Sequence, residues 1–189
     1  MTRAFKPEPI PHELLETVVD AGRRAPSAGN SQGFEFVVLE GHSQTTRYWD
    51  ATLPERQPFG FPGLLVAPAL VIVLAHSQAY VDRYAEPDKA DTGLGAGANR
   101  WPVPYWTVDA AFAAMLIQLA AIDAGLGVLF FGPFEHEAGV LQALGIPDDR
   151  QAIGTIALGW PDTEHDTRAG TSAGRARRDP ADMIHWGRW

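Results

Sequence analysis

The sequence predicts an α+β fold, because segments with helical and strand-like patterns follow one another in the order α-β-β-α-β-α-β. Two long loops separate these segments, and the same order also fits a mixed α/β arrangement. The length of 189 residues is that of one compact domain, which we expect to span residues 1–189. Hydrophobic residues make up 46% of the chain, which is enough to bury a substantial core.

Helices are predicted where apolar residues recur at helical spacing. The first covers about residues 12–24, and Pro26 ends it. Shorter helices are expected over residues 43–51 and 137–144. The helix predicted over residues 107–124 is apolar nearly all round, so we expect it to be buried on all sides. In a chain of this size that favours burial against a second subunit, and the alternative is a central core helix in a monomer.

Four apolar runs predict strands, and the connections between them predict loops. The strands are expected at about residues 34–39, 70–75, 128–131 and 152–159, and the second is apolar throughout, as in a fully buried strand. Loops are expected where prolines and glycines accumulate or no periodicity is visible, at residues 54–68, at 76–106 and in the polar tail 161–182. A loop as long as the second of these is usually functional.

The composition excludes several classes of function. Fifteen basic and 23 acidic residues give a net charge of −8, which argues against binding to nucleic acid or to an anionic membrane. The absence of cysteine excludes disulfides, thiolate metal sites and a cysteine nucleophile. The six histidines form no metal-binding pattern, so no metal is expected. The chain has no apolar signal core and no apolar run near the ~18 residues of a membrane span, so we expect a soluble cytoplasmic protein.

Two segments have the residue types of a ligand site. Residues 25–34 form a loop of small residues and side-chain amides, which can approach a flat ligand closely and offer hydrogen bonds. Arg175 and Arg177 would point to the same side of an extended segment and suit a phosphate dianion, although a solvated tail is the alternative. The acidic cluster around His136 is interpreted as a helix cap, and its loop position leaves a substrate contact open.

The chain resembles the FMN-dependent nitroreductase family. The loop carries the family's run A-P-S-x-x-N-x-Q followed by an aromatic residue, and four other stretches resemble family segments in the same order: residues 2–9, 106–134, 156–161 and 175–186. The resemblance implies a nitroreductase-like fold with a central mixed β-sheet flanked by helices. It also implies an intertwined homodimer whose sites lie at the interface and draw on both subunits.

The resemblance assigns roles to particular residues. FMN would be held by its ring against the loop, by backbone near N5, by a cation near N1 and O2, and by arginines at the phosphate. Pro26, Ser27 and Ala28 would pack on the ring, with Asn30 and Gln32 bracing or contacting it. Gly132 and Pro133 would lie near N5, and Arg3 near N1 and O2. Arg175 and Arg177 would hold the phosphate. Flat substrates would stack on Tyr84, Tyr105 and Phe134, for which ordinary loop packing is the alternative.

The implied reaction is a ping-pong transfer of two electrons from NAD(P)H, through flavin N5, to a nitroaromatic, quinone or similar acceptor. No acid or base residue is required, because the flavin carries the chemistry. Two features depart from the family pattern. The family's arginine and serine before the position of Arg3 have no counterpart after Met1, so either the start lies further upstream or the C-terminal arginines hold the phosphate and FMN is bound more weakly; and Gly33-Phe34 replaces a common Pro-Trp. Other possibilities are a flavin-sequestering protein, a specialised dehalogenase, oxidase or deazaflavin relative, and a cofactor-free domain.

Overall fold

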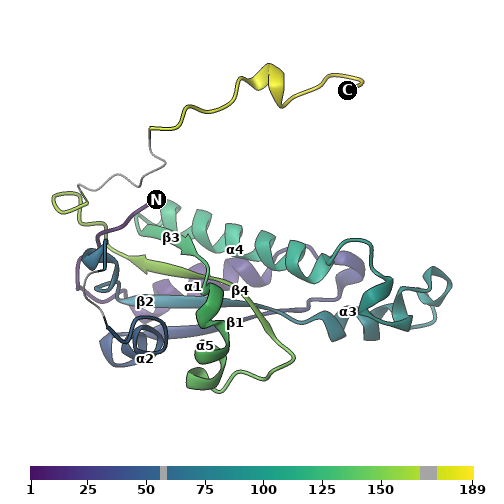
Figure 1. Cartoon of the computed structure of the whole chain (residues 1–189), viewed down its shortest axis with the longest axis horizontal. Coiled ribbons are helices and arrows are strands. Elements are labelled where there is room, and N and C mark those ends of the chain that lie inside the picture. Colours follow the sequence, from purple (N-terminus) through teal and green to yellow (C-terminus); the bar gives the residue numbers. More distant parts are fainter. Residues whose placement is uncertain (56–58, 167–173) are drawn as a thin grey trace.

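The computed structural model of the chain describes residues 1–55, 59–166 and 174–189 (Figure 1). Its sheet has the strand order β1-β2-β4-β3. The strands are β1 (Phe34–Glu40), β2 (Ala69–Ala75), β3 (Gly127–Phe131) and β4 (Gln151–Gly159). All four predicted strands are thus confirmed, with ends that differ from the prediction by one residue or none.

The sheet is antiparallel throughout the described residues, so the mixed sheet expected from the family resemblance is corrected. β1 pairs with β2, β2 with β4, and β3 with β4, each time antiparallel. The long crossover from β2 to β3 does make these two strands run in the same direction. They are not neighbours, because β4 lies between them and is antiparallel to both. The predicted α+β class is confirmed.

Helices cover both faces of the sheet (Figure 1), so β2 buries side chains on both of its sides. Val71 and Val73 face a core that includes α1 (His12–Arg23) and α4 (Tyr105–Asp123). The alternating residues Leu70, Ile72 and Leu74 face a second core, which is completed by α2 (His42–Thr52) and α5 (Glu137–Leu144). The period of two along a strand therefore explains why this segment is apolar throughout.

The segment between β2 and α4 is more regular than the loop expected over residues 76–106. It contains α3 (Ser77–Tyr84) and three short 3-10 turns at Ala90–Thr92, Leu94–Ala96 and Ala98–Arg100. Together they form an arm that projects from one end of the sheet (Figure 1). The arm is held by aromatic packing, since the ring of the fully buried Tyr80 lies edge-on to Trp101 with 5.7 Å between the centroids. Such tertiary packing leaves no periodic pattern in the sequence.

The apolar helix α4 is buried on only one side. Its buried residues include Ala110, Ala113, Ala114, Ile117 and Ala121. The other side exposes 49–55% of four large side chains: Phe112, Met115, Leu119 and Ile122. The alternative of a fully buried core helix within one chain is therefore wrong, and burial of the exposed side against a second subunit stays a prediction. Among the described residues, α4 is also the one helix long and apolar enough to cross a membrane, a test that core helices of water-soluble proteins pass as well.

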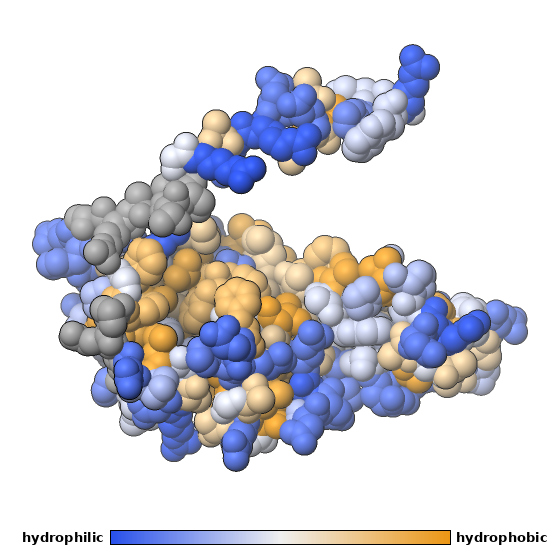
Figure 2. All heavy atoms as spheres, in the orientation of Figure 1, coloured by the Kyte–Doolittle hydropathy of each residue, from blue (hydrophilic) through white to orange (hydrophobic). Residues whose placement is uncertain are grey.

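The C-terminal residues 174–189 extend away from the sheet and helices (Figures 1 and 2). They are exposed, and their regular structure is one 3-10 turn at Pro180–Asp182. Parts of the loop expected at 54–68 and of the polar tail expected at 161–182 lie outside the described residues.

Candidate functional site

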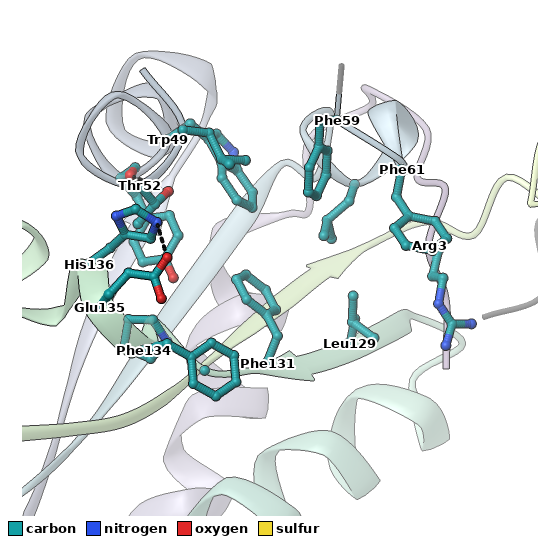
Figure 3. A pocket seen from close by; sticks show the side chains of 15 residues that line it. Arg3, Trp49, Thr52, Phe59, Phe61, Leu129, Phe131, Phe134, Glu135 and His136 are labelled. Carbon is teal, nitrogen blue, oxygen red and sulfur yellow. Dashed lines mark hydrogen bonds and ion pairs between the residues drawn. The ribbon is translucent and has the colours of Figure 1, made fainter. Parts of the chain in front are cut away.

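A cavity of about 380 Å³ opens beside the end of β3, between α2, residues 59–64 and the N-terminal segment (Figure 3). Aromatic rings form much of its wall. Trp49 and Phe131 stack nearly parallel, with 5.9 Å between ring centroids and 7° between planes, and Phe59 meets Phe61 edge-on. The guanidinium of Arg3 lies 5.6 Å from the centre of the Phe61 ring, at one side of the cavity. The site therefore combines flat apolar walls with one permanent positive charge.

The turn after β3 brings a strained aromatic residue to this cavity. Gly132, Pro133 and Phe134 all line it. Phe134 has φ +46°, a left-handed conformation that bulky residues rarely adopt, and 80% of the residue is exposed. Its ring lies so close to Gly132 that a Cβ added there would be 3.1 Å from it. Backbone strain of this kind persists where the fold over-determines it, and it gathers at functional sites.

The residues next to this turn do not form the expected helix cap. No side chain caps the N-terminus of α5, and Glu137 Oε1 instead accepts a hydrogen bond from the Ala152 amide at 2.8 Å. Glu135 and His136 line the cavity, with 3.7 Å between the carboxylate and the ring nitrogen. The capping interpretation is therefore corrected in favour of the cavity position.

The loop after α1 is folded on itself by local hydrogen bonds. Ser27 Oγ accepts from the Gln32 amide at 2.9 Å, and the Asn30 amide donates to the Ser27 carbonyl at 2.9 Å. Gly29, Asn30 and Gln32 have φ values of 62°, 55° and 49°, which Gly and Asn tolerate best. Pro26, Asn30 and Gln32 are exposed, and Ser27 and Ala28 are half-buried. The loop thus presents its amides and small side chains to the surface.

A buried carboxylate, which the sequence interpretation missed, ties this loop to α4. Asp109 is 3% exposed, and its Oδ2 accepts hydrogen bonds from the Ala28 amide at 2.8 Å and from the Tyr80 hydroxyl at 2.7 Å. Burial, and to a lesser extent the hydrogen bond to Asp109, raise the pKa of Tyr80 above its usual value, so its hydroxyl stays protonated and can donate. An acid within an otherwise apolar helical run is the signal that could have revealed Asp109.

The arm supports the same loop from outside. Arg83 Nε donates to the Gly29 carbonyl at 2.8 Å, and its other nitrogens hold Asp88 at 2.7 and 2.8 Å. The ring of Tyr84 packs against Gly29 and lies 4.7 Å from the Trp101 centroid. Tyr84 is therefore occupied in holding the loop, and its expected substrate contact remains a prediction.

The sequence profile described as Nitroreductase family matches residues 1–160. The chain belongs to the nitroreductase family. It is an oxidoreductase. A relative from Archaeoglobus fulgidus, provisionally named NADH dehydrogenase/NAD(P)H nitroreductase, is 26% identical over 167 residues, which is 87% of this chain and 82% of the relative.

Solved structures of nitroreductases share the fold. An FMN-dependent nitroreductase from Clostridium difficile has a TM-score of 0.67 at 20% identity, covering 100% of this chain and 94% of that one. A nitroreductase-like protein from Streptococcus mutans has a TM-score of 0.74 at 15% identity, covering 97% and 92%. At these identities the likeness shows the fold alone.

The predicted nitroreductase site residues fall into three groups within one chain. Arg3, Gly132, Pro133 and Phe134 all line the cavity, and their expected contacts with a flavin or substrate stay predictions. None of the loop residues 26–32 lines that cavity, and Tyr105 lies in the aromatic cluster of the arm, 6.0 Å from Trp101. Arg175 and Arg177 are exposed on the extended C-terminal segment. One chain therefore brings together part of the predicted set.

Proposed function

We propose that this nitroreductase is a cytoplasmic, homodimeric, FMN-dependent enzyme. It would pass two electrons from NAD(P)H to electron-poor acceptors such as nitroaromatics or quinones. The observation that carries the proposal is the convergence of Arg3, Gly132, Pro133 and Phe134 on an aromatic-walled cavity. Each was expected near the flavin or its substrate from the sequence alone.

The chemistry of the cavity fits the ring system of FMN. Flat apolar walls suit a planar ring, and aromatic and aliphatic side chains supply most of the cavity's lining (Figure 3). Bound FMN would supply the two-electron redox chemistry. The Arg3 guanidinium would stabilise negative charge on the ring, which favours uptake of hydride. Phe134 would hold a flat electron donor or acceptor against the open face of the flavin ring, and donor and acceptor would occupy this face in turn.

The separation of the site residues supports a dimer. A second copy could bring its loop 26–32 and its arginines at 175 and 177 to a cavity that lacks both. The exposed apolar side of α4 offers a surface on which the copies could pair. We therefore propose that each FMN site is shared, with the cavity from one subunit and the loop from its partner.

The first test is the visible spectrum of the purified protein before and after anaerobic addition of NADPH and of NADH. We expect a flavin spectrum that bleaches with at least one donor. A flavin spectrum that stays yellow with both would favour a sequestering protein. A colourless protein that takes up no added FMN would contradict the proposal.

Sharing of the site can be tested by mixing two inactive variants. Arg3→Glu damages the cavity half, and Ala28→Glu damages the loop half. Random pairing gives half heterodimers, in which one of two shared sites is intact, so about a quarter of the wild-type flavin sites should return. If each site were built within a single subunit, the mixture of the two variants would recover no flavin sites. Each variant paired with itself is the matched control, and circular dichroism must show that both fold.

A further inference from the structure

We propose that Asp109 is a positioning residue, whose carboxylate holds the cofactor loop in the shape that binds FMN. The proposal rests on the proposed function, because it concerns the loop assigned to the flavin ring. Asp109 does not face the cavity and is no catalytic group. It would act through Ala28, the last of the three residues expected to pack on the ring.

The geometry sets Asp109 apart from an ordinary core residue. Its side chain is a carboxylate at 3% exposure on a helix whose other buried residues are alanine and isoleucine. Burying a charge is costly unless hydrogen bonds compensate for it. Both described donors meet the same oxygen, Oδ2: the Ala28 amide at 2.8 Å and the Tyr80 hydroxyl at 2.7 Å. The arrangement therefore places a strong acceptor beneath one backbone amide of the loop.

That amide matters because few other hydrogen bonds described for the loop reach the sheet and helices. Arg83 holds the Gly29 carbonyl, and the Gly33 carbonyl accepts from the His76 amide at 2.9 Å. The remaining bonds described for the loop run within it or to the end of α1, as from the Ser31 amide to the Ala28 carbonyl at 3.2 Å. Without Asp109, Ala28 would lose its fixed point on α4 while the internal turn stayed formed.

The experiment compares Asp109→Ala with Asp109→Asn in the full chain. Asparagine can place its carbonyl oxygen where Oδ2 lies and accept both bonds, whereas alanine can accept neither. We expect FMN to bind at least tenfold more weakly to D109A, about 1.4 kcal/mol, and within about threefold of wild type to D109N. Val18→Ala removes buried volume from α1 in the same core and is the control for lost stability, with FMN affinity expected to stay unchanged.

Hydrogen exchange followed by NMR in the apoprotein gives a second readout. In the wild type, the Ala28 amide should be strongly protected, and D109A should release it while the Ser31 amide keeps its protection. If D109A does not fold, Tyr80→Phe replaces it: the carboxylate loses its second donor, and we expect faster Ala28 exchange with FMN binding weakened at least threefold.

Several results would overturn the proposal: an unprotected Ala28 amide in the wild type, wild-type FMN affinity in D109A, or equal losses in D109N and D109A. A wild-type protein that binds no FMN would instead refute the proposed function. Because the exchange experiment needs no FMN, the tie between Asp109 and the loop would remain measurable, and the two failures can be told apart.

Discussion

The exposed face of α4 makes a quantitative prediction about assembly. Phe112, Met115, Leu119 and Ile122 each leave about half of their surface exposed, 49–55%. Fully burying such a side chain is worth about 1.5–3 kcal/mol, so burying the remaining half is worth about 1 kcal/mol. With four side chains on each of two subunits, the face would contribute about 8 kcal/mol before the cost of association. This is enough to drive a dimer only if most of the face is covered.

Leu119→Glu tests this estimate. The change removes about 1 kcal/mol of apolar burial per subunit and adds a carboxylate that costs several kcal/mol to desolvate. We expect the dimer to weaken by at least about 3 kcal/mol, which is about a hundredfold in Kd. Sedimentation velocity over a range of concentrations measures the shift, and the flavin content of the same samples should fall with the dimer.

The matched control is Gln142→Glu, which introduces the same side chain at an exposed position of α5, on the opposite face of the sheet. It should leave the dimer intact. An L119E protein that remains dimeric at the wild-type Kd would show that α4 does not form the interface. A wild-type protein that is monomeric at every concentration while binding FMN would refute the shared site as well.

Three further predictions concern stability and the site. Gly33→Ala would place a Cβ 2.8 Å from a backbone carbonyl oxygen and against a buried tyrosine ring, so urea unfolding should show that the free energy of unfolding falls by about 1–3 kcal/mol. The control Gly139→Ala, whose nearest contact would lie at 3.5 Å, should be neutral or stabilising. Equal effects of the two changes would contradict the packing argument. Burial raises the pKa of Tyr48 to about 12, so the unfolded chain ionises first as the pH rises, and the free energy of unfolding should fall by about 2 kcal/mol between pH 10 and 12. A Tyr48→Phe variant with an equally steep fall would refute this cause. Phe134→Gly should relieve about 1 kcal/mol of backbone strain and raise Tm, while raising KM for flat acceptors; a lower Tm would show that the ring stabilises the turn.

The sequence predicted the elements of this fold better than their arrangement. Apolar periodicity located β2 and α4 to within two residues, because burial imposes a period on each element. The direction of neighbouring strands has no such signature, and the insertion of β4 between β2 and β3 therefore could not be read from the sequence. The helix α3 was missed because its packing depends on aromatic residues distant along the chain, such as Trp101 and Trp106.

The candidate site was predictable where it depends on local motifs. Gly132 and Phe134 follow directly after a strand, and Arg3 lies in the N-terminal segment, so local motifs were enough to single them out; the structure places all three around one cavity, and their roles toward a flavin stay predictions. Asp109 was not predictable in the same way. Its two donors come from Ala28 and Tyr80, which are 81 and 29 positions away in the sequence. A polar residue inside an apolar helix signals an unknown partner, and only the structure names it.

The position of α4 suggests that cofactor binding and assembly are coupled in this nitroreductase. The helix holds the Ala28 amide through Asp109 and presents its apolar side to the surface through residues such as Leu119. If the loop of one subunit completes the cavity of the other, FMN binds the dimer and not the separated chains. By linkage, free FMN must then strengthen the dimer by the same factor by which dimerisation strengthens FMN binding. Sedimentation with and without FMN would measure that factor, and an identical dimer Kd in both conditions would show that each chain binds the flavin alone.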